Sequence, residues 1–362
     1  MAIDKTKLAN SIDYRNPTLI GLGASAALTA LVIIGSRNLE HFDSALFGYL
    51  IASIVAFGAI FFRYALWLQR PATRAYFSRG LKLFFQRKKF ARNTLDATKT
   101  VGINMLAQKF IFKRARSRWL MHFLIMWGCI LSAAITFPLV WGWIHFKLES
   151  ETGYRAYVFG FPMQSMDVHS VMAFFTFKAL NFTAIMVLIG CAIAIHRRLK
   201  DRGAIAVQQF LLDFVPHLLL IAICVSGLML TASSAFFGGY MYSFIALTHQ
   251  AIVIMTLFFL PFGKLFHIVQ RPASIGVELY QQRAKEMEQA KCRRCGVEFA
   301  SVMWLGDLKS VVEKVGFDYT MENGETLQDY CPRCKRVMRG LAYSVLMDRP
   351  DKVFHGTRAD GE

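Results

Sequence analysis

Apolar residues along this chain fall into six long blocks that are separated by polar or charged segments. A run of about 20 apolar residues is long enough to cross the hydrocarbon core of a bilayer as a helix. The blocks therefore predict six transmembrane helices, at about 17–36, 45–68, 119–143, 170–195, 212–235 and 247–268. The polar N-terminal segment lacks the pattern of a signal peptide, and a further polar segment follows the last block.

Positive charge is concentrated in a few of the segments between these blocks. The net charge is +18, and residues 70–118 alone hold fourteen Lys or Arg and one acid, Asp96. The segment 196–203 is also basic, whereas 144–169 is mixed in sign and 236–247 is uncharged. Because positive loops stay cytoplasmic, both termini are expected to face the cytoplasm, in the inner membrane of a bacterial or archaeal cell. No nucleic-acid-reading motif accompanies the charge, so a nucleic-acid partner is not expected.

The last apolar block carries a histidine near each end, at His249 and His267. Their spacing of 18 residues equals five turns of a regular helix and about 27 Å of rise, which predicts one shared face at two depths. Pro261 and Gly263 between them are expected to bend the helix. Two histidines at opposite depths suit two stacked haems, each of which takes axial imidazoles. The alternative is a pair of interfacial histidines with solvated tips.

Partners for these two histidines are sought on the other blocks. At the cytoplasmic depth, His122 is the preferred partner of His267 and His217 is the rival. His196, beside two arginines, is interpreted as a solvated boundary residue.

At the outer depth, His169 opens the fourth block and is the preferred partner of His249. His145 is less suitable, since it follows His122 by about 34 Å of helical rise and lies off its face. His41 and His355 lie in polar stretches and receive no role.

Three motifs carry a resemblance to a known family. The run "FLPFGKLFH" with the two histidines resembles the last span of the gamma subunit of respiratory nitrate reductase, a dihaem cytochrome b. "RWLMHFLIMWG" and "HSVMAFFTFKALN" resemble helices of the cytochrome b subunits associated with heterodisulfide-reductase-like Fe–S oxidoreductases. The resemblance covers about residues 45–271. It implies haem b, quinone as the exchangeable substrate, and partner subunits with Fe–S or other redox centres.

The resemblance departs from the family at one position. Nitrate reductase gamma subunits carry another histidine ten residues after the first ligand, where this chain has Ser132. The inner haem, on His122 and His267, therefore carries over residue by residue. At the outer site, either His169 replaces the missing ligand or the chain holds a single haem.

Lys178 and Asn181 lie inside the fourth block, two to three turns from its outer end. A lysine at such depth in a membrane is a functional candidate by default, and a haem propionate or a quinone carbonyl would suit it. The alternative is a lysine that extends its amine along the helix to the membrane surface.

Beyond the last block, four cysteines form the pattern CxxC–x35–CxxC, at Cys292, Cys295, Cys331 and Cys334. Two such knuckles complete a tetrahedral metal site, and they resemble those of rubredoxin and zinc ribbons. The pattern leaves Zn and Fe open as the metal. A disulfide is disfavoured, because this segment is expected in the reducing cytoplasm. Cys129, Cys191 and Cys224 lie within the blocks and are interpreted as packing residues.

These patterns together predict an all-α integral membrane helical bundle with a small C-terminal metal ribbon built on the four cysteines. The expected division is an N-terminal segment with an extra helix (1–44), a cytochrome b-like domain (45–271), an amphipathic linker (272–290), the ribbon (291–340) and a polar tail (341–362). The expected function is electron transfer between quinone and a partner redox subunit, which would carry the substrate chemistry. The alternative is a non-redox transporter or assembly scaffold with a structural zinc ribbon.

Overall fold

The computed structural model describes residues 12–201, 203, 206, 208–321 and 324–347. Within them, six helical segments are long and apolar enough to cross a membrane. They confirm the six predicted blocks, and most helix ends lie within a few residues of the predicted ends. The segments are α2 (Arg15–Gly35), Ser44–Leu68 with α3 (Phe47–Leu68), α7 (Arg116–Val140), α8 (Val171–Lys200), Phe210–Phe236 with α10 (Val215–Phe236), and α11 (Tyr242–Phe262).

The chain forms two compact units. The bundle unit comprises Asp13–Trp67 and Thr98–Pro272, which include all six apolar helices almost entirely. The ribbon unit comprises Leu68–Ala97 together with the described residues from Ala273 onward. The sequence division did not anticipate that the basic segment after α3 would pack with the C-terminal region.

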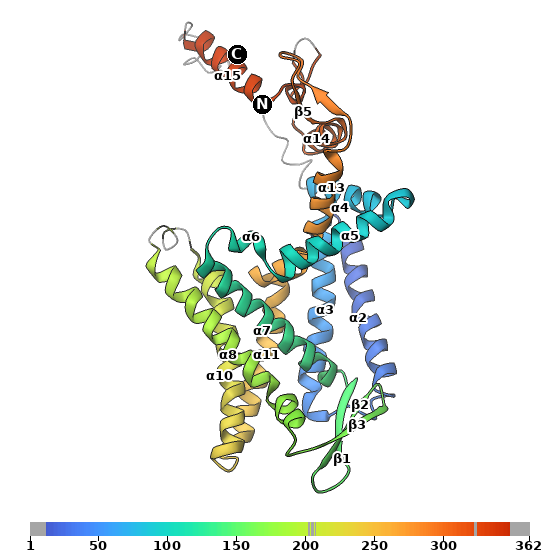
Figure 1. Cartoon of the computed structure of the whole chain (residues 1–362), viewed down its shortest axis with the longest axis vertical. Coiled ribbons are helices and arrows are strands. Elements are labelled where there is room, and N and C mark those ends of the chain that lie inside the picture. The colour runs from blue at the N-terminus through green and yellow to red at the C-terminus, as the bar shows by residue number, and fades with distance from the viewer. Residues whose placement is uncertain (1–11, 202, 204–205, 207, 322–323, 348–362) are drawn as a thin grey trace, which may run out of the picture. The chain divides into compact units, whose positions relative to one another are not determined.

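Small residues let the long helices of the bundle unit approach one another. A side chain at Gly128 would press against Val187, and one at Gly190 would press against Ile125, so α7 and α8 pack closely. Helix α10 packs against both α8 and α11 in the bundle that Figure 1 shows. Gly21 of α2 similarly meets Gly58 of α3 at backbone distance, and the Ser25 hydroxyl donates to the carbonyl of Ile54.

The segment between α7 and α8 forms a three-stranded antiparallel sheet rather than an open loop. Its strands are β1 (Ile144–Leu148), β2 (Gly153–Val158) and β3 (Phe161–Asp167), in the order β1-β2-β3. Shorter elements of the unit are η1 (Ser44–Leu46), η3 (Val101–Leu106), α6 (Lys109–Phe112), η4 (Phe210–Phe214), η5 (Lys264–Phe266) and α12 (His267–Gln270).

The ribbon unit is built on a helix pair. Helices α4 (Pro71–Phe84) and α13 (Ala273–Ala284) meet where Gly80 and Gly276 pack backbone against backbone, and they bury Leu83, Leu279 and Tyr280 between them. The predicted amphipathic linker is thus helical over α13, and its apolar face packs on α4. The other elements are η2 (Arg87–Lys89), α5 (Phe90–Thr100), β4 (Gln289–Lys291), β5 (Glu298–Ser301), α14 (Val302–Lys314), η6 (Leu327–Asp329) and α15 (Pro332–Met347).

Candidate functional sites: a cysteine cluster and a set of histidines

The four predicted cysteines converge in the ribbon unit. The sulfur atoms of Cys292, Cys295, Cys331 and Cys334 all lie within 4.8 Å of one another. In the described part of the chain, no other group of three or more potential ligands lies this close. Four thiols at this spacing match the donor set of a tetrahedral Zn or Fe site. The predicted ability of the cluster to bind a metal ion is therefore supported by its geometry.

Backbone N–H groups point at the sulfurs from within the two knuckles. The Cys331 N–H donates to Cys292 Sγ at 3.3 Å, and the Cys334 N–H donates to Cys331 Sγ at 3.4 Å. Desolvation acts to raise the pKa of Cys292, but N–H groups of Cys331, Cys295 and Arg294 outweigh it and lower the pKa to about 6. Desolvation is the main cause that raises the pKa of Cys334 to about 12. The cluster thus holds both a thiol that ionises readily and one that a metal ion must deprotonate.

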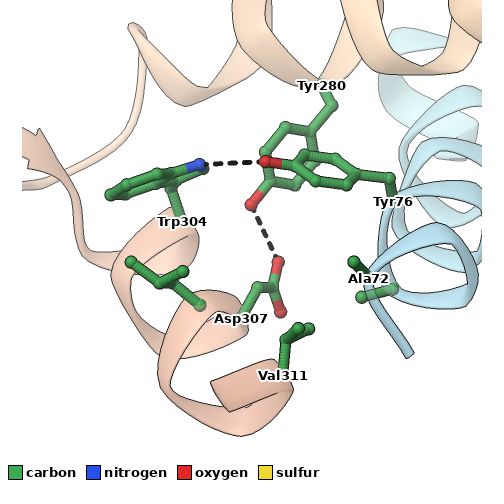
Figure 2. Close-up of a pocket in the computed structure, with 8 residues that line it drawn as sticks. Ala72, Tyr76, Tyr280, Trp304, Asp307 and Val311 are labelled. Carbon is green, nitrogen blue, oxygen red and sulfur yellow. Dashed lines mark hydrogen bonds between the residues drawn. The ribbon is translucent and has the colours of Figure 1, made fainter. Parts of the chain in front are cut away.

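Helix α14 ties the ribbon to α4 and α13 through one carboxylate. Asp307 accepts hydrogen bonds from Arg79 Nε at 3.0 Å, from the second guanidinium arm of Arg79 at 2.5 Å, and from the Tyr280 hydroxyl at 2.9 Å. The Trp304 indole donates to the Tyr76 hydroxyl at 3.2 Å. Figure 2 shows Tyr76, Tyr280, Trp304 and Asp307 around a cavity. Its volume of about 80 Å³ has room for a few water molecules only. The contacts therefore anchor α14 rather than form a substrate site.

A buried arginine joins the remaining helices of the ribbon unit. Arg283 is only 2% exposed and donates to Asn93, Glu286 and Asp96 at 3.0, 2.9 and 2.6 Å. Asn93 in turn donates to the carbonyls of Leu83 and Phe84 at the end of α4. One guanidinium thereby connects α13 with α5 and, through Asn93, with α4.

In the bundle unit, the structure brings His122 and His267 together. Their ring centroids are 6.4 Å apart, with an angle of 60° between the ring planes. The Nδ1 atom of His122 lies 2.9 Å from Oε1 of the buried Gln108, and Nδ1 of His267 lies 2.6 Å from the Lys264 carbonyl. With each Nδ1 held in this way, Nε2 is the nitrogen left to bind a ligand. Gln108 was not anticipated, since nothing in its sequence surroundings distinguishes it.

His267 does not continue the helix that carries His249. Helix α11 ends at Phe262, Gly263 is extended, and a 3-10 turn precedes His267. The five-turn alignment of the two histidines on a regular helix is therefore wrong, because the expected bend at Pro261 and Gly263 is a break.

An arginine from α3 stabilises this break. Arg63 donates to the carbonyl of Pro261, in the last turn of α11, and to the carbonyl of Gly263, which also accepts from the Phe266 N–H at 3.4 Å. Its guanidinium also lies over the Phe266 ring, 4.4 Å from the centroid. Arg63 thus holds the backbone that leads into His267.

The outer histidines are not joined by any contact. The Nδ1 atom of His249 lies 2.8 Å from the Ser226 hydroxyl of α10. His169 is exposed just before α8, and its backbone N–H donates to Asp167. In the described residues neither ring contacts the other. Ser132, at the position of the family histidine, donates instead to the Thr183 hydroxyl at 2.7 Å.

The rival inner histidine and the intramembrane lysine have distinct surroundings. Nδ1 of His217 lies 2.8 Å from the Asp213 carbonyl, so its Nε2 is also left for a ligand. Lys178 is half-buried and makes no hydrogen bond or ion pair within the described part of the chain. Asn181, one turn further along α8, accepts a hydrogen bond from Thr231 of α10 at 3.0 Å.

His41, which receives no role from the sequence, stacks on His145, the less suitable candidate at the outer depth. The rings of His41 and His145 are 4.2 Å apart between centroids, and Tyr157 stacks on the other side of His145 at 4.9 Å. All four imidazole nitrogens of the pair are buried without a hydrogen-bond partner in the described structure. Sequence analysis missed this pair, because the two residues are far apart in the chain and lie in loop-like segments.

Comparison of the chain with known proteins identifies no relative. No protein-family model matches it, and neither curated proteins nor solved structures give a significant match.

Proposed function

We propose that this protein is the cytochrome b-type membrane subunit of a redox complex, which passes electrons between quinone and a partner subunit. The pairing of His122 with His267 is the observation that carries the proposal. An iron bound between two imidazoles through bonds of about 2 Å would place the ring centroids roughly 6 Å apart. The separation of 6.4 Å fits this arrangement. Bound there, haem b would supply one-electron chemistry.

The surroundings of the pair suit axial ligands. Hydrogen bonds to Nδ1 fix the tautomer and the orientation of each ring, which metal-binding histidines require. Gln108 would do so for His122, and the Lys264 carbonyl for His267. Both histidines come from segments distant in sequence, α7 and the turn after α11, so their approach is not a by-product of local spacing.

The outer haem is proposed to bind between His249 and His169. His249 has its Nδ1 engaged by Ser226, as an axial ligand would. His169 remains the proposed partner on the residue pattern, with no contact to support it. Lys178 is proposed to interact with a haem propionate or a quinone carbonyl, since a partly buried cation in a membrane helix requires an anionic or polar partner.

The ribbon is proposed to hold one Zn or Fe ion on the cytoplasmic side, with both termini facing the cytoplasm. The positive segments of the sequence support that orientation. Iron would let the ribbon exchange electrons, whereas zinc would make it a structural element beside the partner. Substrate chemistry would reside on an Fe–S or other redox subunit.

The first test is an optical one on the purified full chain. A reduced-minus-oxidised spectrum with b-type bands, and a pyridine haemochrome value of about two haems per chain, are expected. A value near one would remove the outer site, and a haem-free protein would contradict the proposal and favour a transporter or scaffold with a zinc ribbon.

Ligand assignment is tested by single replacements with a matched control. His122→Ala and His267→Ala should each remove the same inner haem, while His217→Ala should leave it in place. His249→Ala and His169→Ala should remove the outer haem. Loss of the inner signal in His217→Ala, with retention in His122→Ala, would reassign the inner site to His217.

A further inference from the structure

The surface around the cysteine cluster is strongly basic. Six cationic side chains lie on the two knuckles and are here called the knuckle rim: Lys291, Arg293, Arg294, Arg333, Lys335 and Arg336. Five of them are exposed, and Lys335 is partly exposed. The same segments, 291–298 and 330–336, contain a single acid, Glu298. Cys295, in the middle of the first knuckle, is the exposed member of the four thiols.

Two ordinary explanations account for only part of this charge. A divalent ion with four thiolates carries a net charge of −2, which a few cations would offset, but the rim supplies six. Ion pairing neutralises little of this charge, because among the described residues the rim forms one ion pair, between Arg293 and Glu325 at 3.9 Å. The cytoplasmic charge bias of membrane proteins applies within about 15–20 residues of a span. Arg294 already lies 32 residues beyond the end of α11 at Phe262.

We infer that the knuckle rim is a docking surface for an acidic protein, which presents its carboxylates to the cations around Cys295. Complementary charge at an interface accelerates encounter and fixes the orientation of the partners. Docking there would bring the partner to the exposed edge of the metal site. The identification of this partner as a redox subunit rests on the proposed function, whereas the docking itself does not.

The test uses the full chain in nanodiscs of zwitterionic lipid and an acidic plant-type [2Fe–2S] ferredoxin as the probe. We expect binding that weakens about ten-fold between 50 and 200 mM salt, because exposed charges are increasingly screened over this range. The triple variant Arg294→Glu, Arg333→Glu, Arg336→Glu should weaken binding at 50 mM salt by about ten-fold or more. These three side chains are exposed and form no ion pair within the described part of the chain, so their replacement should leave the fold of the ribbon intact.

The matched control reverses three exposed cations elsewhere in the ribbon unit, with Lys82→Glu, Arg87→Glu and Lys88→Glu. It changes the total charge equally and should leave ferredoxin binding within about two-fold of the parent. Equal loss in both triple variants would overturn the inference, since net charge alone would then explain it. Absence of ferredoxin binding by the parent, or binding unaffected by the rim variant, would also overturn it.

Two further measurements separate the remaining explanations. The metal content of the charge-reversal variant must stay at one ion per chain. If the charge reversal releases the ion, the triple glutamine variant is used in its place, and the decrease in the logarithm of its ferredoxin affinity should be about half as large. Flotation with phosphatidylglycerol vesicles tests a lipid surface instead: a rim variant that loses vesicle binding but keeps ferredoxin binding would overturn the inference. Haem spectra of the same samples report on the proposed function independently of docking.

Discussion

The ribbon unit and the bundle unit hold their candidate ligands in contrasting ways. In the ribbon unit, four thiols converge within 4.8 Å, and backbone N–H groups of the same knuckles point at them. In the bundle unit, His122 and His267 meet across 145 residues of chain, whereas the stacked rings of His41 and His145 have four nitrogens without a hydrogen-bond partner in the described structure. The first site is closed by its own loops, whereas the second depends on the packing of whole helices.

The contrast follows from the length scale of each motif. A CxxC knuckle fixes two ligands within one turn, so only the approach of two knuckles must be specified. The imidazoles of His122 and His267 belong to separate helices. Their separation depends on every contact that positions these helices, including the hydrogen bonds from Arg63 to the end of α11. Loss of one cysteine should therefore disorder the whole ribbon, whereas loss of one helix contact, such as that of Arg63, should change the bundle only locally.

The largest effect is expected from Cys331→Ser. Removal of one thiolate should release the metal ion, and the small ribbon should then lose its order, because structural zinc contributes on the order of 10 kcal/mol to such folds. Metal analysis and proteolysis within 289–347 measure the effect. Cys224→Ser, a buried thiol outside the cluster, is the control and should keep the metal. Haem spectra that disappear with the metal would contradict the independence of the two units.

A smaller loss is expected for Arg283→Met in the ribbon unit. The change leaves Asn93 and Asp96 without the guanidinium that they contact, and breaking a buried ion pair costs about 3–5 kcal/mol. The partial exposure of Asp96 and Glu286 places the expected value near the lower end of that range. Hydrogen exchange of α5 and α13 should accelerate. Arg92→Met, an exposed partner of Glu286, should change exchange little, and equal effects would show that the burial of Arg283 contributes nothing.

Arg63→Met tests the bundle unit in the same way. Its loss removes the donors to the carbonyls at the end of α11, and charged hydrogen bonds contribute about 1.5–3 kcal/mol. Amide exchange should rise over 263–270, the segment that contains His267, with the other long helices unchanged. Arg116→Met is a suitable control, because Arg116 is exposed at the start of α7. Unaltered exchange at 263–270 would mean that the break in α11 holds His267 without Arg63.

Much of the fold could be predicted from hydrophobic pattern, because lipid exposure requires long uninterrupted apolar runs. The six spans and the CxxC knuckles were both local signals of this kind. The β1–β3 sheet was not predicted, since its strands are short, partly polar and depend on one another for pairing. The association of α4 with α13 was also missed: it rests on Gly80 meeting Gly276 across 196 positions, which no local pattern encodes.

The candidate site was predictable to a similar extent. Spacing was sufficient for the cysteines. For the histidines, depth left both His122 and His217 as partners of His267, and the resemblance of the motifs favoured His122. Sequence pattern was insufficient for Gln108, whose side chain reaches His122 only because a left-handed backbone turn at φ 52° directs the chain there. The spacing of His249 and His267 also predicted that both lie on one regular helix. An apolar run does not distinguish a bend from the end of a helix, so this prediction was misleading.

The smallest effect concerns the histidine stack of the bundle unit, and it is a dependence on pH. Desolvation, with contributions from His41 and Lys147, lowers the pKa of His145 from 6.5, and Glu40 opposes this only weakly. The unfolded state therefore binds this proton more readily than the folded state. The contribution of His145 to the free energy of unfolding is thus complete above about pH 6.5 and is lost as the pH falls below it. Hydrogen exchange in β1 and β2 should therefore accelerate between pH 7 and pH 5 relative to the rest of the unit. His145→Phe keeps an aromatic ring against Tyr157 and should abolish the dependence, whereas His196→Gln, at an exposed position of α8, should retain it. A pH dependence that survives in His145→Phe would assign the titration to another group and leave the stacked pair as packing alone.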